Sequence, residues 1–204
     1  MTAVRELAFD DLFKFNRIIF DPLTEVYSIS FFVSRLIEFP MLAKVAVAPN
    51  EQLMGFAMGT RIINEDVVGD GNDSRVMGSH GHVSVVSIDS DFRRLGLGTL
   101  LMDGLKAKME VDGDWYVDLF VRCKNQNAIK FYELLGYVKY CFLSKYYVDD
   151  YGYEMRLPLS QDVEGVCLKR KVNVIEGFYS AGQEMLQLVR VVMDRLKNAI
   201  MNML

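Results

Sequence analysis

One segment constrains the fold more than any other: an apolar stretch typical of a β-strand runs directly into glycines typical of a helix start. Residues 80–88 are rich in valine and predict the strand. The chain continues as Arg93-Arg94-Leu95-Gly96-Leu97-Gly98-Thr99, and leucines four apart at positions 97, 101 and 105 predict the helix. Glycines let a ligand approach the backbone, and the free N–H groups and dipole of a helix start attract an anion. The two arginines add charge-assisted donors, so the segment predicts a phosphate-binding site.

Two well-known phosphate-binding motifs do not match these residues. A P-loop requires Gly-Lys followed by Ser or Thr, which is missing here. A dinucleotide-binding fingerprint requires a third glycine or alanine at the position of Leu101, and it belongs to a parallel βαβ unit near the start of a chain. Two interpretations are left: a phosphate cradle of another type, or an ordinary helix start with arginines on its surface.

The rest of the pattern predicts an α/β domain. The expected strands cover residues 2–9, 44–48, 53–63, 80–88, 115–121, 137–143 and 153–157. The expected helices cover residues 10–20, 28–38, 97–109 and 125–135. Pro22 and Pro40 end the first two helices, because proline cannot continue a helix. This order predicts a mixed central sheet of about six or seven strands flanked by about four helices.

The end of the chain differs in character from this domain. We expect the domain to span residues 1–160 and a C-terminal extension to span residues 161–204. From about residue 175 the extension carries an apolar stripe of helical period, which predicts an amphipathic helix. The stripe consists of Met185, Val189, Val192, Leu196, Ile200 and Met203. This helix could fold on the domain, contact a partner, or be an extension particular to one lineage.

Composition narrows the cellular setting. The 204 residues include 23 Lys and Arg against 27 Asp and Glu, a net charge of −4, without a basic block. This balance gives no support to direct nucleic-acid binding or to binding at a membrane surface. No uncharged apolar run reaches the about 18 residues that a membrane span needs, and charges interrupt the start of the chain. Three widely spaced cysteines form neither a disulfide framework nor a thiol-metal pattern, so we expect a cytoplasmic protein.

The strand–glycine–helix segment, with its Arg-x-x-Gly-x-Gly pattern, is similar to the acetyl-CoA loop of the GNAT acetyltransferase superfamily. A second stretch, Asn125 to Tyr137, resembles the GNAT helix that flanks the pantetheine arm of the cofactor. The two motifs stand in the family's order, about 30 residues apart. This resemblance implies the GNAT fold and acetyl-CoA as co-substrate. The implied cofactor-binding residues are Val86, Ser87, Ile88, Arg93, Arg94, Leu95, Gly96, Leu97, Gly98, Thr99 and Asn125.

Further stretches within residues 1–160 resemble the catalytic subunits of NatB-type N-terminal acetyltransferases. They include Asp10-Asp11-Leu12-Phe13, Asp21-Pro22-Leu23-Thr24-Glu25-Val26-Tyr27, His80-Gly81-His82-Val83, Val117-Asp118-Leu119-Phe120-Val121-Arg122 and Lys145-Tyr146-Tyr147. The resemblance implies acetylation of the α-amino group of nascent chains that begin with Met followed by Asp, Glu, Asn or Gln. It also implies a stable complex with a large TPR-repeat auxiliary subunit that docks on the ribosome.

The same resemblance assigns roles to individual side chains. The residues implied to bind the substrate peptide are Glu25, Tyr27, His82, Tyr146 and Tyr147. His82 would also reach the second residue of the peptide, and His82 and Glu25 would help to deprotonate the amine. Tyr132 would be the general acid that protonates the CoA thiolate. No metal is implied.

The chemistry of an α-amine suits such a site. Its pKa is about 7.7–8.0, against about 10.4 for lysine, so a weak base or a water relay can remove its proton. We expect direct attack of the neutral amine on the thioester in a ternary complex. Backbone N–H groups of residues 83–88 would polarise the thioester carbonyl.

Plainer interpretations stay open. His80 and His82 share one face of a strand and could bind zinc, although no third ligand is evident, or could bond only to backbone groups. The paired tyrosines could be sheet aromatics, and Glu25 could cap a helix. Six large apolar residues could be a docking face for the auxiliary subunit or could simply cover the sheet: Ile18, Ile19, Phe31, Phe32, Ile37 and Phe39. The chain could also acetylate another N-terminus, a lysine or a small amine, or bind CoA without catalysis.

Overall fold

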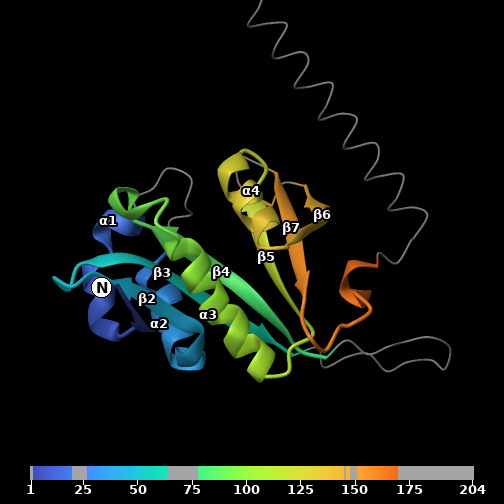
Figure 1. Cartoon of the computed structure of the whole chain (residues 1–204), viewed down its shortest axis with the longest axis horizontal. Coiled ribbons are helices and arrows are strands. Elements are labelled where there is room, and N and C mark those ends of the chain that lie inside the picture. Colours follow the sequence, from blue (N-terminus) through green and yellow to red (C-terminus); the bar gives the residue numbers. More distant parts are fainter. Residues whose placement is uncertain (1, 20–26, 64–77, 145, 148–150, 170–204) are drawn as a thin grey trace, which may run out of the picture. The chain divides into compact units, whose positions relative to one another are not determined.

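The computed structural model describes residues 2–19, 27–63, 78–144, 146–147 and 151–169, and these form a seven-stranded mixed sheet flanked by helices (Figure 1). The strands are β1 (Ala3–Glu6), β2 (Ala43–Val47), β3 (Leu53–Ile62), β4 (His80–Ile88), β5 (Tyr116–Arg122), β6 (Val138–Leu143) and β7 (Gly152–Pro158). They stand in the order β1-β2-β3-β4-β5-β7-β6. Every neighbouring pair in this described sheet is antiparallel except β4 and β5, which are parallel. The predicted α/β class and mixed sheet are confirmed.

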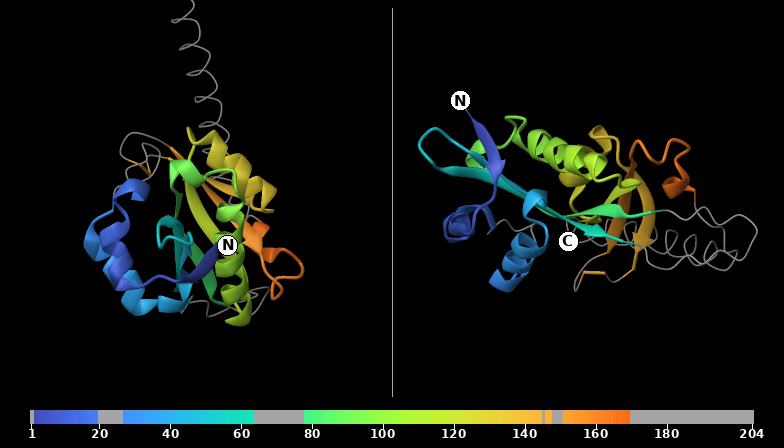
Figure 2. Two further views of the ribbon diagram at one scale, coloured as in Figure 1. Left: turned by 60° about the vertical axis from the view of Figure 1, so that its left-hand side comes forward. Right: turned by 90° about the horizontal axis from the view of Figure 1, so that it is seen from below.

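Four α-helices accompany the sheet in the described part of the chain, as predicted. They are α1 (Asn16–Ile19), α2 (Ile29–Glu38), α3 (Leu97–Val111) and α4 (Gln126–Leu134). Short 3₁₀ turns are η1 (Phe9–Lys14), η2 (Pro40–Leu42), η3 (Ser90–Phe92) and η4 (Val166–Leu168). Figure 2 shows α2 and α3 on opposite sides of the sheet. Each face of the sheet therefore has its own apolar core.

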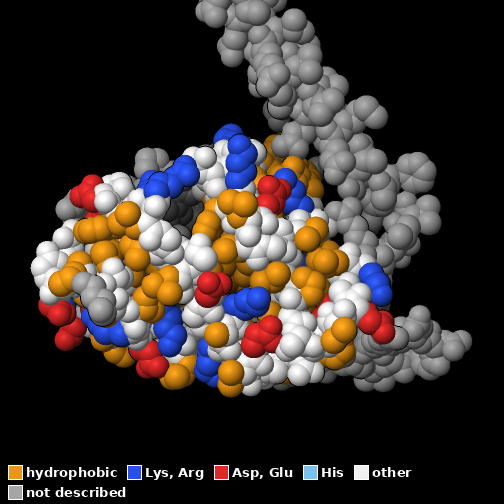
Figure 3. All heavy atoms as spheres, viewed as in Figure 1, with side chains coloured by type: hydrophobic (Ala, Val, Ile, Leu, Met, Phe, Trp, Pro, Cys, Tyr) orange, Lys and Arg blue, Asp and Glu red, His pale blue; other side chains and the backbone are white. Residues whose placement is uncertain are grey.

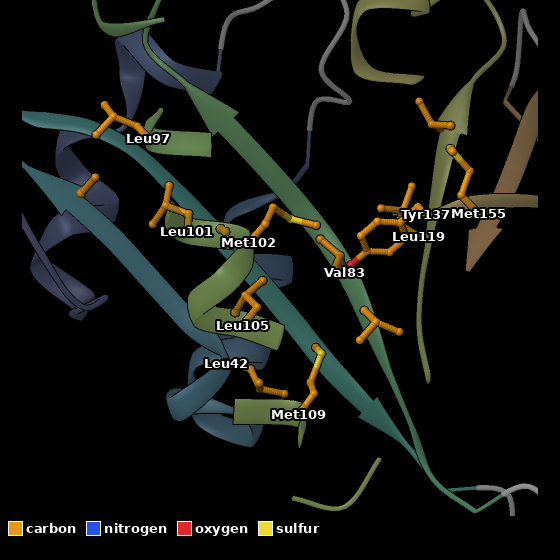
Figure 4. Close-up of a cluster of buried hydrophobic side chains, with 14 of the residues drawn as sticks. Leu42, Val83, Leu97, Leu101, Met102, Leu105, Met109, Leu119, Tyr137 and Met155 are labelled. Carbon is orange, nitrogen blue, oxygen red and sulfur yellow. The ribbon is translucent and has the colours of Figure 1, made fainter. Parts of the chain in front are cut away.

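The two cores have different compositions. Under α3, residues four apart along the helix, Leu101, Leu105 and Met109, are buried with strand residues of β4, β5 and β7 (Figure 4). Under α2 and η1 the core combines aliphatic side chains with phenylalanines: the rings of Phe15 and Phe56 stack with their centroids 4.2 Å apart and their planes 8° apart. Large side chains that match the helical and strand periods thus hold the helices against both faces of the sheet.

Of the two interpretations of the six large apolar residues on the first two helices, covering the sheet fits most of them, because they belong to the apolar cores or pack against them. Ile18 and Phe32 are each only 2% exposed, and Ile37 is the member of the six that is strongly exposed, at 67%. The large apolar residues that this region does expose are Phe9, Phe13, Ile29, Ile37 and Met41. Sequence periodicity identified apolar helix faces but could not tell which of them the sheet covers.

The first predicted helix, residues 10–20, forms instead as the 3₁₀ turn η1 followed by the short helix α1 in the described residues. The carboxylate of Asp11, which is buried, accounts for the tight turn. It accepts a hydrogen bond from the N–H of Ala8 at 2.9 Å and two from the guanidinium of Arg5 at 2.6 and 2.9 Å. These bonds hold η1 against β1. Asp11 therefore caps a tight turn and does not begin a regular helix.

We expect Asp11→Ala to lower the free energy of unfolding by about 2 kcal/mol at pH 7, because it removes the cap and leaves the N–H of Ala8 without its partner. The hydrogen bonds from Arg5 hold the pKa of Asp11 below its usual range. The stabilisation is therefore present above about pH 4 and is lost as the pH falls through the lowered pKa. Denaturant titrations at neutral and strongly acidic pH measure the effect, which should vanish in acid.

The neighbouring Asp10 offers a matched control, because its side chain is exposed. Asp10→Ala should change the free energy of unfolding by less than about 0.5 kcal/mol. Equal losses for the two variants would contradict the role given to Asp11.

Residues Met1–Leu168 form one compact unit. Its last segment is attached to the sheet through Asp162, whose carboxylate accepts the N–H groups of Val166 and Cys167 at 2.7 and 2.8 Å. Arg156 of β7 then donates to the carbonyl of Cys167 at 2.9 Å. The division at residue 160 stays a prediction, and the predicted C-terminal helix lies outside the described residues. Among the described helices, none has the length and apolar character required to cross a membrane.

Candidate active site

The parallel strands β4 and β5 separate part-way along their length. Their register pairs residues 81–83 with residues 117–119, although β4 continues to Ile88 and β5 to Arg122. A cleft of about 120 Å³ opens where they diverge. It is lined by Tyr27, Val83, Ser84, Val85, Val86, Leu119, Phe120, Val121, Arg122, Asn125, Ala128, Tyr132 and Tyr147. Four segments therefore meet around the cleft: the two splayed strands, the start of α4, and the segment before α2.

A β-bulge in β4 accompanies this separation. Opposite β3, Met58 pairs with Val85 and Gly59 pairs with Val83, so Ser84 is the extra residue. The bulge shifts the alternation of side chains: Val83 belongs to the core under α3, whereas Val85 belongs to the core under α2. Bulges bend a strand, and this one lies where β4 leaves β5. Beyond residue 83 no strand of the described residues pairs with the edge of β4 that faces β5, so the N–H groups on this edge are directed toward the cleft.

The start of α3 has the geometry of an anion-binding site. Gly96 precedes the helix with φ 78° and without a side-chain cap, and Arg94 has φ 64°. The first N–H groups of a helix have no partner within it and carry the positive end of its dipole. Arg93 fixes the turn by donating from Nε to the carbonyl of Ile88 at 3.0 Å. Figure 3 shows the surface hollowed between this turn and α4, with Lys and Arg side chains on the rim.

A glycine brings α3 and α4 close together beside the hollow. A Cβ atom at Gly98 would lie 3.0 Å from Cζ of Phe131, a separation tighter than ordinary van der Waals contact. Glycine at this position lets α4 approach the first turn of α3. Because Gly98 has no side chain, the start of α3 lies close to the polar residues of α4.

Helix α4 contributes two polar groups to the cleft. Asn125 caps the helix, because its Oδ1 accepts the N–H of Ala128 at 3.1 Å, and its side chain lines the cleft. Tyr132 lines the cleft about two turns further along the helix. Burial raises the pKa of Tyr132 to about 12, and the nearby Tyr27 raises it further in the same direction. At neutral pH the Tyr132 hydroxyl is therefore a hydrogen-bond donor.

The opposite wall of the cleft is formed by Tyr27, which lies just before α2. The ring of Tyr27 stacks on Phe31 with centroids 3.9 Å apart, and its hydroxyl donates a long hydrogen bond of 3.5 Å to the carbonyl of Ser84. Arg35 donates from Nε to the hydroxyl of the same serine at 3.4 Å. Ser84, at the bulge of β4, is therefore hydrogen-bonded both to Tyr27 and to Arg35 of α2.

His82 lies one residue before the separation of the strands. Its Nδ1 is 2.7 Å from Oδ1 of Asp118, the residue directly opposite on β5. Asp118 is buried, and its second oxygen lies 3.8 Å from Nε2 of His80. Burial is the main reason that the pKa of His80 is lowered, and its ring stacks on Tyr116. Asp118 can therefore fix the ring orientation of His82.

A row of aromatic rings continues from His82 along the same face of β5. Phe120 lies 5.0 Å from the His82 ring and 4.9 Å from the ring of Tyr146, measured between centroids. Tyr146 contacts Tyr147 at 5.0 Å, and the guanidinium of Arg122 lies 4.4 Å above the ring of Tyr147. This row gives the cleft an apolar floor with hydroxyl and cationic groups at its margin. In the described part of the chain, no cluster of three or more His, Cys, Asp or Glu could hold a metal ion.

Comparison with known proteins identifies the family. Residues 7–137 match the model described as "Acetyltransferase (GNAT) family". The chain is 37% identical over 177 residues to N-terminal acetyltransferase B complex catalytic subunit NAA20 of Arabidopsis thaliana, covering 84% of this chain and 95% of that protein. It is 38% identical over 170 residues to the naa20 catalytic subunit of Schizosaccharomyces pombe, covering 80% and 88%. The chain belongs to the GNAT acetyltransferases, in the family of NatB catalytic subunits.

Solved structures agree with this membership. The crystal structure of Chaetomium thermophilum Naa20 in complex with a bisubstrate analogue is 30% identical in sequence and superimposes with a TM-score of 0.72. The match covers 83% of this chain and 93% of that one. The predicted GNAT fold and the predicted NatB-type resemblance are therefore confirmed.

In this GNAT chain the residues predicted to bind the cofactor fall into three groups. Val86 and Asn125 line the cleft. Arg93, Arg94, Leu95, Gly96, Gly98 and Thr99 surround the start of α3, where Leu97 is buried and can offer only its backbone. Ser87 is buried and donates to the carbonyl of Ile18 at 2.8 Å, while Ile88 packs against the core under α3, so these two also can offer only backbone groups to a ligand.

The predicted peptide-binding and catalytic residues of this NatB-type chain are only partly brought together. Tyr27, Tyr132 and Tyr147 line one cleft. His82 and Tyr146 lie beside it through Phe120. Glu25 lies outside the described residues. These positions leave the predicted roles as proposals.

Three residues near the cleft escaped the sequence interpretation: Ser84, Asp118 and Arg122. Ser84 reaches the cleft because of a bulge, which follows from strand pairing and leaves no local signal. Asp118 and Arg122 alternate with Leu119 and Val121 on β5, so the alternation of a strand places the two polar residues on one face. Their importance depends on the register with β4, which sequence alone does not give.

Proposed function

We propose that this chain transfers an acetyl group from acetyl-CoA to the α-amino group of proteins that begin with Met followed by Asp, Glu, Asn or Gln. The observation that carries the proposal is the cleft between β4 and β5. It has a helix start suited to phosphate on one side and a wall of tyrosines on the other. Family membership supports the reaction class, since relatives are named as N-terminal acetyltransferase catalytic subunits.

The cofactor side follows from the polar groups that converge there. The N–H groups of the first turn of α3, with Arg93 and Arg94, would hold the pyrophosphate of acetyl-CoA. The unpaired edge of β4 beyond residue 83 would bond to the pantetheine amides and polarise the thioester carbonyl. Asn125, at the start of α4, lines the same cleft and would lie beside the pantetheine arm.

The reaction proceeds by direct attack of the neutral amine on the thioester carbonyl within a ternary complex. Removing a proton from an α-amine at pH 7 costs about 1 kcal/mol, so a weak base or a water relay suffices. His82, oriented by Asp118, is the described residue suited to this role, with Glu25 as a second candidate. The amine nitrogen forms the new bond to the acetyl carbon, and the carbon–sulfur bond of the thioester breaks.

Tyr132 supplies the proton donor for the departing sulfur. Its pKa of about 12 keeps the hydroxyl protonated throughout the neutral range. The donor stabilises negative charge as it develops on sulfur, an interaction that strengthens in the transition state.

The active species is proposed to be a complex with a large TPR-repeat auxiliary subunit, which operates on nascent peptides at the ribosome in the cytoplasm. The described residues expose Phe13 at 81%, Ile29 at 59% and Ile37 at 67% around η1 and α2. Apolar side chains of this size gathered on one region are suited to burial in an interface.

Acetyl transfer from labelled acetyl-CoA to peptides beginning Met-Asp, Met-Leu and Ser-Glu tests the proposal. The assay uses the chain alone and the chain co-expressed with its auxiliary subunit. We expect the complex to prefer Met-Asp over the other two by at least about tenfold. A preference for Met-Leu or Ser-Glu would overturn the substrate class, and full activity of the isolated chain would overturn the requirement for a partner.

A further inference from the structure

Two histidines of β4 lie beside the two oxygens of one carboxylate on β5. Nδ1 of His82 is 2.7 Å from Oδ1 of Asp118, and Nε2 of His80 is 3.8 Å from Oδ2 of the same residue. The first distance is that of a strong hydrogen bond, and the second is that of an electrostatic contact, which can shorten when substrate binds. Asp118 is buried, and the two histidines share a face of the strand because they are two residues apart. Each oxygen of this carboxylate is therefore next to a different imidazole ring.

The ring of His80 is held in its orientation by packing. It is buried, and it stacks on the ring of Tyr116 with centroids 4.5 Å apart and planes 5° apart. The guanidinium of Arg156 lies 4.8 Å from the centroid of the Tyr116 ring and is itself bonded to Glu154 at 2.5 Å. Stacked rings of this kind resist reorientation because the interior around them is close-packed. The Nε2 atom of His80 therefore stays directed at the carboxylate.

The proton of the neutral His80 ring belongs on Nε2. The other ring nitrogen, Nδ1, is buried, and no described residue forms a hydrogen bond with it. A buried N–H without an acceptor is rarer in proteins than a buried acceptor without a donor. A proton on Nε2 instead points to the negative charge of Asp118. His80 is thus a donor to the carboxylate.

His80 also stays uncharged at neutral pH. Burial lowers the pKa of its ring, and the nearby Arg156 and His82 lower it further. The carboxylates of Asp118 and Asp114 act in the opposite direction without overcoming this effect. A neutral ring donates one N–H to Asp118 but does not form an ion pair that would compete with His82 for its charge.

We propose that His80 is a positioning residue for acetyl transfer: its Nε2–H holds the second oxygen of Asp118, so that the first oxygen fixes the ring of His82. This inference rests on the proposed function, in which His82 helps to remove the proton of the amine. With its Nδ1–H donated to Asp118, His82 keeps Nε2 unprotonated and able to accept that proton. The ring of His82 lies 5.0 Å from that of Phe120, which lines the cleft.

Two variants of His80 separate positioning from packing, measured as kcat and KM for a Met-Asp peptide with the chain in complex with its auxiliary subunit. His80→Phe keeps a ring to stack on Tyr116 and removes the N–H. We expect kcat to fall about tenfold with KM little changed, because a misplaced base loses part of its contribution. His80→Gln loses the ring but places an amide N–H near the position of Nε2, so kcat should stay within about threefold. A packing role predicts the opposite order, because phenylalanine fills the space of the ring and glutamine does not.

Two further variants test the route by which His80 acts. His82→Ala removes the residue that His80 is proposed to position, so adding His80→Phe to it should lower kcat no further. Ile62, which is exposed, pairs with His80 across β3 and β4. Ile62→Thr alters the same end of the sheet and keeps a β-branched residue, so kcat should be unchanged.

The two tautomers can be observed directly, because the chain contains two histidines. Nitrogen NMR of the full chain with isotope-labelled histidine should show the proton on Nδ1 of His82 and on Nε2 of His80 at neutral pH. His80→Phe removes one set of signals and thereby assigns both rings. A proton on Nδ1 of His80 would overturn the inference.

The kinetic results distinguish this inference from the proposed function. An unchanged kcat in His80→Phe, or a further loss when it is added to His82→Ala, would give His80 a purely structural role. An unchanged kcat in His82→Ala would also overturn the inference, because no base would remain to be positioned. Each of these results leaves the proposed function intact if the unmodified complex acetylates the peptide. No transfer by the unmodified complex would refute the proposed function itself.

Discussion

Replacing Tyr132 with phenylalanine is expected to lower kcat by about a hundredfold and to change KM for acetyl-CoA and for the peptide little. The hydroxyl lines the cleft, and its pKa of about 12 keeps it protonated at the pH of the assay. A proton donor that acts on charge developing on sulfur contributes in the transition state rather than in the ground state, so its loss appears in kcat. Steady-state kinetics with both substrates varied measures the effect.

A matched control for this variant is Tyr140→Phe. Tyr140 lies on β6 with the guanidinium of Arg156 3.5 Å above its ring, and it does not line the cleft. The same loss of a hydroxyl there should leave kcat unchanged. Because the pKa of Tyr132 is far above neutral, kcat of the unmodified enzyme should also show no loss from ionisation of this hydroxyl below about pH 11. An unchanged kcat in Tyr132→Phe would remove this residue from the mechanism.

Replacing Gly98 with valine is expected to lower kcat/KM for acetyl-CoA by about a hundredfold, mainly through KM. A Cβ atom at this position would lie 3.0 Å from Phe131, and a branched side chain would press further against α4. Helix α4 carries Asn125 and Tyr132, so its displacement moves both groups relative to the phosphate cradle. Misplacements on the order of 1 Å can cost about 10²-fold in rate. Titration of CoA binding by calorimetry separates lost affinity from lost turnover.

The control is the same substitution at Gly104, in the same helix. A Cβ atom at Gly104 meets nothing within 4 Å, and the residue is remote from the first turn. Gly104→Val should leave CoA affinity unchanged and should slightly favour the helix, because glycine is a weak helix former. Equal loss of CoA affinity in both variants would show that α3 tolerates no added side chain at either site. The close approach of Gly98 to Phe131 would then not be the cause of the lost affinity.

Much of this architecture could be predicted because its signals are local. The valine-rich run of β4, the glycines before α3 and the leucines four apart in α3 are each determined by neighbours in sequence, and all three form as predicted. The cap at Asn125 is likewise local, since it depends on an N–H three residues ahead. Such signals predicted the sheet, the order of the elements and the position of the helix start that we propose binds phosphate.

Other features depend on contacts between distant parts of the chain. The bulge at Ser84 exists only in the register of β4 with β3, and the bond from Asp118 to His82 exists only in the register of β4 with β5. The first helix becomes a 3₁₀ turn because Arg5, on another element, bonds to Asp11. Helical periodicity cannot include such partners, which is why it also could not decide whether Phe32, which is buried, covers the sheet or faces a partner.

The proposed function requires that the acetyl group goes to an α-amine. The most direct measurement is fragment-ion mass spectrometry of a peptide that begins Met-Asp and carries an internal lysine, after reaction with acetyl-CoA and the complex. We expect acetyl on the N-terminal nitrogen alone, because an α-amine loses its proton at neutral pH far more readily than lysine. Acetyl on the lysine side chain, with the N-terminus unmodified, would contradict it.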